Sequence, residues 1–330
     1  MSSWALIGFL LAAYSIVAND AIQTLGTFLS SNRHRGWVSL WLYACSILAV
    51  VILYGWWRYG DASYGRLEAI PPVPEVSWIF AIPPLAILVL TRLGIPVSTS
   101  FLILTVFAPS ALGSMLNKSV LGYTIAFAAG AVIYLLIAWR LERIFKESDS
   151  PPKPYWVWLQ FISTGLLWSQ WLIQDLANIM VYLPRQITLA GILGVLAILF
   201  ALHAFIFYRR GGEIQKIVTS KTQTADIRSA TIIDFVYAGL LFFFTQLSNI
   251  PMSTTWVFIG LLAGREIGIN LRAKYRPLSS AWREVAQDVA KAGVGLGVSV
   301  LLALGLPYLA GGQTASATQA SLVEESLPDK

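Results

Sequence analysis

Long apolar stretches separated by short polar loops make up almost the whole chain. A helix rises about 1.5 Å per residue, so the longer stretches can cross a hydrocarbon core of about 30 Å. They fall near residues 3–29, 37–57, 77–94, 118–140, 155–181, 187–208, 229–249 and 286–310. Two shorter apolar segments, 95–113 and 250–269, each begin at a Pro-x-Ser-Thr sequence. Because proline favours the start of a helix and cannot donate within it, we expect these two helices to begin inside the bilayer.

The composition supports this interpretation. The chain has 330 residues, of which 56% are hydrophobic and 12% charged, as is typical of a membrane protein with several spans. Cys45 is the single cysteine, which excludes an intramolecular disulfide and a cysteine-based metal site. The first charged residue is Asp20, so no basic region of a signal peptide precedes the first apolar stretch, and we expect the N-terminus to be retained.

Two polar motifs recur at one spacing. Asp20 and Asp175 lie 155 positions apart (175 minus 20), and Ser98 and Ser253 keep the same offset. Each motif sits inside or beside an apolar run, where an ionisable residue is costly and indicates function. The register predicts a duplicated unit, with a first repeat over 1–145 and a second over 146–310. The polar segment 311–330 is expected to be a disordered tail.

The loop charges predict how the two units are oriented. The net charge of +6 lies mostly in loops, so it indicates topology rather than a nucleic-acid partner. Placing the most basic loops in the cytoplasm puts 30–37, 140–154, 209–228 and 265–283 inside, and 58–76, 114–118, 182–187 and both termini outside. Loops 58–76 and 209–228 hold matching places in the two units but lie on opposite sides. We therefore predict an all-α polytopic inner-membrane protein with two inverted-topology repeats and interrupted or re-entrant helices.

The first motif offers ligands for a cation. Carboxylate and amide oxygens are hard ligands suited to Na⁺, and residues three apart share a helix face. Asp20 and Asp175 are the candidate Na⁺ ligands. The complete predicted cation-binding set is Asn19, Asp20, Gln23, Gln174, Asp175 and Asn178.

The second motif offers donors for an anion. Free N–H groups at a helix start, together with neighbouring hydroxyls, can bind a tetrahedral oxyanion. The predicted anion-binding residues are Ser98, Thr99, Ser100, Ser253, Thr254 and Thr255. Neither motif contains Lys or Arg, and two ionised aspartates would repel a divalent anion. A cation must therefore enter with the anion, or the carboxylates must be protonated, which favours symport over uniport.

Structural roles compete with these functional ones. A single aspartate in an apolar run is more often a helix cap or a paired structural group, and Ser-Thr after proline is an ordinary helix N-cap. The matched repetition favours function for both motifs. Asp234 has no counterpart at Ile79 in the first unit, and the sequence leaves open whether it is a gate or a cap.

The four motifs resemble those of the inorganic phosphate transporter family, cation-coupled symporters with a repeated GANDVANA and a repeated PVSTTH. Residues 17–23 and 172–178 are similar to the first motif, and residues 96–100 and 251–255 to the second. The resemblance implies Na⁺- or H⁺-driven uptake of phosphate, or of sulfate, with the aspartates binding the cation and the hydroxyls the anion. The chain departs from the motifs at Gln23 and Gln174, and Phe101 and Trp256 replace the histidines.

We therefore predict a secondary transporter, not an enzyme, that moves an inorganic oxyanion with Na⁺ or H⁺ by alternating access. Phosphate is the first choice and sulfate the second. No organic cofactor is expected, and the expected partners are the anion, the coupling cation and the lipid bilayer, with a homo-oligomer left open. The alternative is a non-transporting sensor or partner subunit that kept the transporter fold. An intramembrane enzyme is the weakest alternative, because no nucleophile–histidine arrangement is present in either unit.

Overall fold

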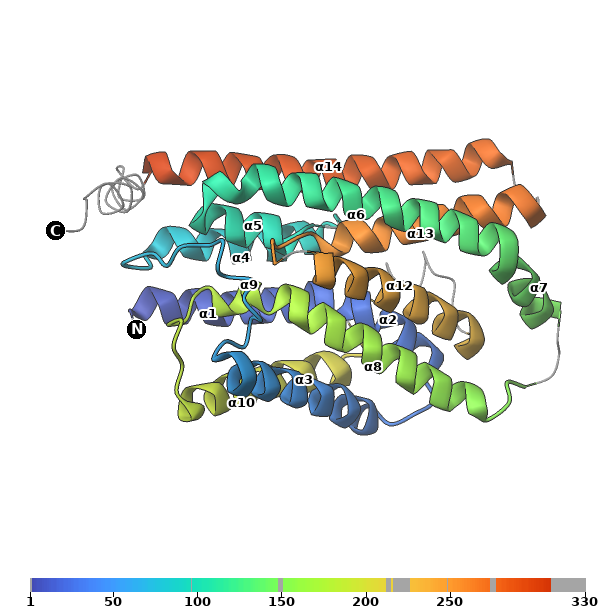
Figure 1. The fold of residues 1–330 in the computed structure, drawn as a ribbon, viewed down its shortest axis with the longest axis horizontal. Helices are drawn as coiled ribbons and strands as arrows, with labels where there is room; N and C mark the ends of the chain where they lie inside the picture. The colour runs from blue at the N-terminus through green and yellow to red at the C-terminus, as the bar shows by residue number, and fades with distance from the viewer. Residues whose placement is uncertain are drawn as a thin grey trace.

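The computed structural model describes residues 2–95, 97–147, 151–211, 215, 226–247, 249–273 and 277–309. Within these ranges every regular element is a helix. Six of the described helices are long and apolar enough to cross a membrane. Figure 1 shows the long helices lying with their axes roughly side by side. The chain is therefore an all-α membrane protein, as the hydropathy pattern predicts.

The first half of the chain contains one bent span, one straight span, a short hairpin and a long span. The bent span is α1, η1 and α2, in which a π-helical turn interrupts the regular helix. The elements are α1 (Ser3–Ile16), η1 (Val17–Ala21), α2 (Ile22–Ser31), α3 (Trp37–Tyr59), η2 (Trp78–Ala81), α4 (Ile82–Arg92), α5 (Thr99–Phe107), η3 (Pro109–Ala111), α6 (Leu112–Ile133), η4 (Tyr134–Ala138) and α7 (Trp139–Glu147).

The second half follows the same order of elements. An interrupted span is followed by a straight span, a hairpin and a long span. These elements are α8 (Tyr155–Asp175), α9 (Ala177–Met180), α10 (Leu189–Tyr208), α12 (Ile227–Leu247), α13 (Thr254–Ala273) and α14 (Leu278–Leu309).

The two hairpins enter the molecule from different ends. In Figure 1, α4 and α5 occupy the end where the N-terminus lies, whereas α12 and α13 occupy the end where α7 lies. Their turns meet, because the hydroxyl of Thr255 donates to the carbonyl of Val97 at 3.1 Å. Both hairpins turn at a Ser-Thr sequence, so the hydroxyl clusters lie inside the protein rather than at either end.

The long helix α6 packs very closely on α13. A Cβ atom added to Gly264 would lie 2.0 Å from the carbonyl oxygen of Phe127, and one added to Gly130 would lie 2.6 Å from that of Leu261. Only glycine permits this approach of two backbones, as at the small-residue interfaces of membrane helices. The contact joins a helix of the first half to a helix of the second.

The predicted element boundaries need three corrections. Helix α6 begins at Leu112, so the predicted outer loop 114–118 is part of the helix, and Lys118 is buried in the protein instead of facing water. Helix α5 covers only 99–107 of the predicted 95–113, because Ala108 precedes Pro109 and takes a non-helical conformation. Helix α14 begins at Leu278 rather than 286, with polar first turns that hydropathy does not detect. Residues 311–330 and most of loop 209–228 lie outside the described residues.

Candidate functional site

The first aspartate lies in the π-helical turn η1. A π-turn widens the helix by one residue and is frequent at functional sites. The Asp20 side chain is 1% exposed. It accepts hydrogen bonds from the amide of Asn19, at 2.6 Å, and from the hydroxyl of Thr99 at the start of α5. The hydroxyl cluster of the first hairpin is thus in direct contact with the first carboxylate.

The second aspartate ends α8, at the turn that precedes the short helix α9. Asp175 has no exposed surface. Its Oδ1 accepts from the hydroxyl of Ser100 and from the amide of Asn178, each at 3.0 Å. Its Oδ2 accepts from the hydroxyl of Thr254 at 2.6 Å. Both hairpins therefore donate hydroxyl groups to this one carboxylate.

The two carboxylates belong to one hydrogen-bonded cluster. The Asn178 amide donates to the hydroxyl of Thr99 at 3.0 Å, and that hydroxyl donates to Asp20. The pairs Thr99–Asp20 and Thr254–Asp175 are each separated by 79 residues, so equivalent positions of the two halves make the same contact. Burying two carboxylates and several hydroxyls at one place is costly, which marks the cluster as a functional candidate.

Some predicted anion-binding hydroxyls have other partners. Ser98 accepts from the backbone N–H of Phe101, and Ser253 accepts from that of Trp256, each at 3.2 Å. Both serines therefore make the N-cap contact that ordinary helix starts use. Thr255 joins the two hairpins through Val97. Of the six predicted hydroxyls, Thr99, Ser100 and Thr254 contact the aspartates directly.

Among the predicted cation-binding amides, too, some contact the cluster and others have a partner elsewhere. Gln23 donates to Asn19 at 3.3 Å, on the edge of the cluster, whereas Gln174 donates to the hydroxyl of Thr245 in α12 at 2.8 Å. The Oδ1 atom of Asn178 and the Oε1 atom of Gln174 are buried, and neither accepts a hydrogen bond from the residues that the structure describes. Buried oxygens of this kind, beside a carboxylate, suit a hard cation such as Na⁺.

The two aromatic residues that depart from the family motifs lie together. The ring centroids of Phe101 and Trp256 are 5.9 Å apart, across the meeting point of the two hairpins. Phe101 is fully buried. These rings therefore form an apolar contact one residue beyond Ser100 and Thr255.

Sequence reasoning missed several polar contacts around this cluster. Thr91 of α4 donates to Asn19 at 3.3 Å. The basic residues Arg66 and Lys118 are buried next to the hairpin α12–α13, where they donate to the carbonyls of Thr245 and Ile250. Their charges alone could have pointed to them, but a basic residue near a span end is ordinarily read as a topology signal.

Asp234, left open by the sequence, is a buried residue in the middle of α12 and not a loop cap. It has no exposed surface, and it accepts from the hydroxyls of Thr27 and Thr164, each at 2.6 Å. These partners lie on α2 and α8, so the carboxylate joins three helices. It is separate from the cluster around Asp20 and Asp175.

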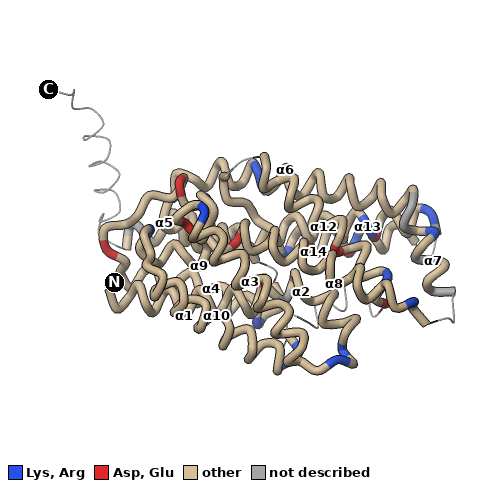
Figure 2. The backbone as a smooth tube through the Cα atoms, turned by 60° about the horizontal axis from the view of Figure 1, so that its bottom comes forward, with Lys and Arg blue, Asp and Glu red and all other residues tan. Residues whose placement is uncertain are grey.

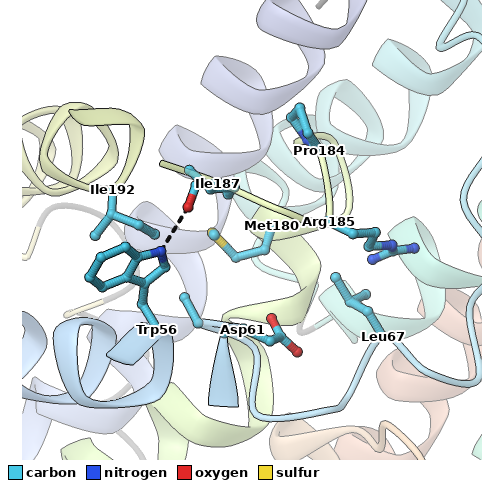
Figure 3. A pocket seen from close by; sticks show the side chains of 10 residues that line it. Trp56, Asp61, Leu67, Met180, Pro184, Arg185, Ile187 and Ile192 are labelled. Carbon is cyan, nitrogen blue, oxygen red and sulfur yellow. Dashed lines mark hydrogen bonds between the residues drawn. The ribbon is translucent and has the colours of Figure 1, made fainter. Parts of the chain in front are cut away.

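A small hollow lies between the end of α3 and the connection 181–188. Figure 3 shows its lining, in which the indole nitrogen of Trp56 donates to the carbonyl of Ile187 at 2.7 Å. Asp61 and Arg185 also line it, but none of the predicted site residues does. The hollow is therefore distinct from the carboxylate–hydroxyl cluster.

Interrupted helices that meet around buried polar groups inside an all-helical membrane fold are a recurring feature of secondary transporters. A solved structure described as "The sodium-dependent phosphate transporter" superposes on this chain with a TM-score of 0.60 at 16% sequence identity. The match covers 93% of this chain and 98% of that one. No model of a known protein family matches the sequence. No curated protein matches it either.

The chain thus has the fold of a phosphate transporter, as the resemblance of its four motifs predicts. The likeness extends over both halves of the chain and is to a transporter rather than to an enzyme. At 16% identity it establishes the fold and leaves the substrate to be argued from the residues.

Proposed function

We propose that this protein is a secondary active transporter that carries an inorganic oxyanion, phosphate first, together with Na⁺ or H⁺. The observation that carries the proposal is the joining of Asp20 and Asp175 with three hydroxyls from two different hairpins. Carboxylates suit a cation and hydroxyls suit an oxyanion, so one cluster offers ligands for both. The solved transporter of the same fold is described as sodium-dependent, which agrees with the cation role.

The hydrogen bonds suggest how cation and anion binding would be coupled. A hydroxyl group has one hydrogen to donate. In the arrangement described here, Thr99 and Thr254 give that hydrogen to the aspartates. A cation on the carboxylates would satisfy the same oxygens and allow the hydroxyls to turn toward an anion. The anion would then bind well only after the cation, as symport requires.

The architecture proposed for this mechanism is a pair of inverted repeats, 1–145 and 146–310, with alternating access around the central cluster. The opposite entry of the two hairpins supports it (Figure 1). Figure 2 shows Lys and Arg gathered at the end of the molecule where α7 lies, which by the positive-inside rule is the cytoplasmic end. The N-terminus and the end of α14 would then lie outside the cytoplasm, in an inner membrane. No organic cofactor enters this proposal.

The decisive experiment is uptake of radiolabelled phosphate and sulfate into proteoliposomes. Three conditions are compared: an inward Na⁺ gradient, an inward H⁺ gradient, and neither. Gradient-dependent accumulation of one anion would identify the substrate and the coupling ion together. If folded, correctly inserted protein accumulated neither anion, the transporter proposal would be replaced by transport of another anion or by a non-transporting sensor or partner subunit.

A further inference from the structure

Asp234 joins three helices on the side of the central cluster where α7 lies. Its carboxylate accepts from Thr27 of α2 and from Thr164 of α8, each at 2.6 Å, and all three side chains are buried. Thr27 comes seven residues after Asp20 (27 minus 20), which is about 10 Å along a helix. The contact therefore lies between the central cluster and the α7 end of the molecule (Figure 1).

The same positions of the duplicated unit meet at the opposite end. The offset of 155 residues pairs Thr27 with Tyr182 (182 minus 27). It also pairs Phe235, the neighbour of Asp234, with Phe80 (235 minus 80). The Tyr182 hydroxyl donates to the carbonyl of Phe80 in η2 at 2.8 Å. Tyr182 follows α9, toward the end of the molecule where the N-terminus lies (Figure 1), so this contact is on the other side of the central cluster.

Helix α1 completes this second contact, as α8 completes the first. A Cβ atom added to Gly8 would lie 2.5 Å from the ring of Tyr182, so α1 packs directly on that ring. Gly8 is the equivalent of Ser163, which precedes Thr164 in α8 (163 minus 8 is 155). Three equivalent elements therefore meet on each side of the central cluster. They are α2, α8 and α12 on one side, and the segment after α9, α1 and η2 on the other.

The two contacts differ in chemistry. At the α7 end a carboxylate accepts from two hydroxyls, whereas at the opposite end aromatic rings pack around Tyr182. The ring centroids of Tyr182 and Phe107 are 5.1 Å apart, and those of Phe107 and Phe80 are 4.4 Å apart. A buried hydrogen bond can be exchanged for one to water at a small net cost, whereas separating packed rings exposes apolar surface. The two ends should therefore open independently of each other.

Alternating access requires a barrier on each side of the bound ions, one of which opens while the other stays closed. The two central aspartates are almost fully buried, so both sides are closed in this structure. We propose that the contact of Asp234 with Thr27 and Thr164 is the gate at the α7 end, with Asp234 as its positioning residue. The contact of Tyr182 with Phe80 is the gate at the opposite end. The inference rests on the proposed function and deepens it, since it names where the transport path opens.

Cysteine accessibility in the full chain tests each gate from its own side. Cys45 is the single cysteine, so reporter cysteines are placed in a Cys45→Ser background. Thr24→Cys puts a thiol on α2 between Asp20 and Thr27, where the Thr24 hydroxyl is buried without a hydrogen-bond partner among the described residues. Ile179→Cys is the equivalent reporter in the second half (179 minus 24 is 155). Labelling rates with a membrane-impermeant cationic thiosulfonate are measured in right-side-out and in inside-out membrane vesicles.

Each gate variant should change the labelling rate from one side only. Asp234→Ala should raise the rate at Thr24→Cys by about tenfold or more from the α7 side, because it removes both hydrogen bonds between the helices. Asp234→Asn should raise it much less, since an amide can accept from one threonine and donate to the oxygen of the other. Tyr182→Ala should raise the rate at Ile179→Cys from the opposite side. Lys153→Cys, at an exposed position between α7 and α8, identifies the vesicles whose α7 side faces the reagent.

Thr231→Ala is the matched control. Thr231 is buried in α12 one turn before Asp234, but its hydroxyl donates to the carbonyl of Ile227 in its own helix, at 2.7 Å. This variant loses a buried hydrogen bond without touching the contact between the helices, so its labelling rates should match those of the parent from both sides. If Asp234→Ala does not fold, Thr27→Val decides, because it keeps the shape of the side chain and removes only the bond from α2.

The outcomes separate the gates from the proposed function. Equal increases from both sides, or the parent rate in both Asp234→Ala and Thr27→Val, would overturn the gate assignment while leaving anion transport intact. Labelling as fast in Asp234→Asn as in Asp234→Ala would contradict it as well, because the hydrogen bonds would then not hold the gate. Wild-type protein that accumulates neither phosphate nor sulfate would instead overturn the proposed function, since the labelling rates do not depend on which anion is carried.

Discussion

The side-chain amide of Asn178 donates a hydrogen bond of 3.0 Å to the hydroxyl of Thr99. Asn178 follows the break after α8, and Thr99 begins α5, so the contact joins elements from opposite halves of the chain. Through Thr99 it reaches Asp20, and through its own bond to Asp175 it reaches the second carboxylate. Any ion that displaces one of these bonds must therefore affect both aspartates.

Neutralising either central aspartate is expected to abolish ion-coupled uptake. Asp20→Asn and Asp175→Asn keep the side-chain shape but remove the charge proposed to bind a cation, so gradient-driven accumulation should fall to the level of empty liposomes. Glu68→Gln, at an exposed position of the connection between α3 and η2, is the carboxylate control and should retain uptake. Wild-type accumulation in either central variant, with normal membrane insertion, would remove the proposed cation site.

The threonines at equivalent positions should have equivalent effects. Thr99→Val and Thr254→Val each remove a buried hydroxyl that donates to an aspartate, so each should destabilise the protein by about 1–3 kcal/mol and reduce anion affinity. Thr105→Val provides the control, because Thr105 is buried in the same helix α5 but donates only to the carbonyl of Phe101. It should lose stability with unchanged anion affinity, as measured by thermal unfolding and radioligand binding. Unaltered anion binding in both Thr99→Val and Thr254→Val would contradict the assigned role.

The serines within the same motifs should separate into two classes. Ser98 and Ser253 cap helices, so Ser98→Ala and Ser253→Ala should each cost about 1 kcal/mol of stability with little effect on ion binding. Ser100 donates to Asp175, so Ser100→Ala should instead weaken the binding of Na⁺. Thermal unfolding and Na⁺ titration on the three variants would distinguish the classes. The reverse order of effects would show that the hydroxyl assignments are wrong.

The glycine contact between α6 and α13 should be sensitive to a single methyl group. In Gly264→Ala the new Cβ would meet the backbone of Phe127, which cannot move aside without separating the helices. We expect a loss of about 1–3 kcal/mol or more, seen as a lower unfolding temperature in detergent. Gly293→Ala in α14 has open space at the same atom and should be neutral or slightly stabilising. Equal melting temperatures for the two variants would argue against the close contact.

The membrane class, the positions of most spans and the helix starts that follow the two Pro-x-Ser-Thr sequences could be predicted from the sequence. Hydropathy identifies spans because the bilayer demands apolar side chains, and proline marks where α5 and α13 begin. The start of α6 could not be predicted, because a lysine is expected to face water and therefore indicates a loop. Lys118 is instead buried, and it donates to the carbonyl of Ile250. A contact between residues 132 positions apart has no local signature.

The candidate site could be predicted only in part. Repetition drew attention to the aspartates and to both hydroxyl clusters, and the structure brings Asp20, Asp175, Thr99, Ser100, Thr254 and Asn178 together. The division between capping serines and site-facing threonines depends on where each helix begins, within one residue, which sequence patterns do not resolve. Gln174 illustrates the same limit, since its amide turns to Thr245 in α12 rather than to the neighbouring Asp175.

The close approach of α6 and α13 restricts how this protein can change shape. Their backbones are in direct contact at Gly130, Gly260, Gly264 and Gly268, and no side chains separate the two helices at these positions. Neither helix can slide past the other without breaking several of these contacts at once. The two helices therefore form one rigid unit, and the alternating access proposed above would require the chain to bend elsewhere, for example at the helix breaks at η1 and Leu176.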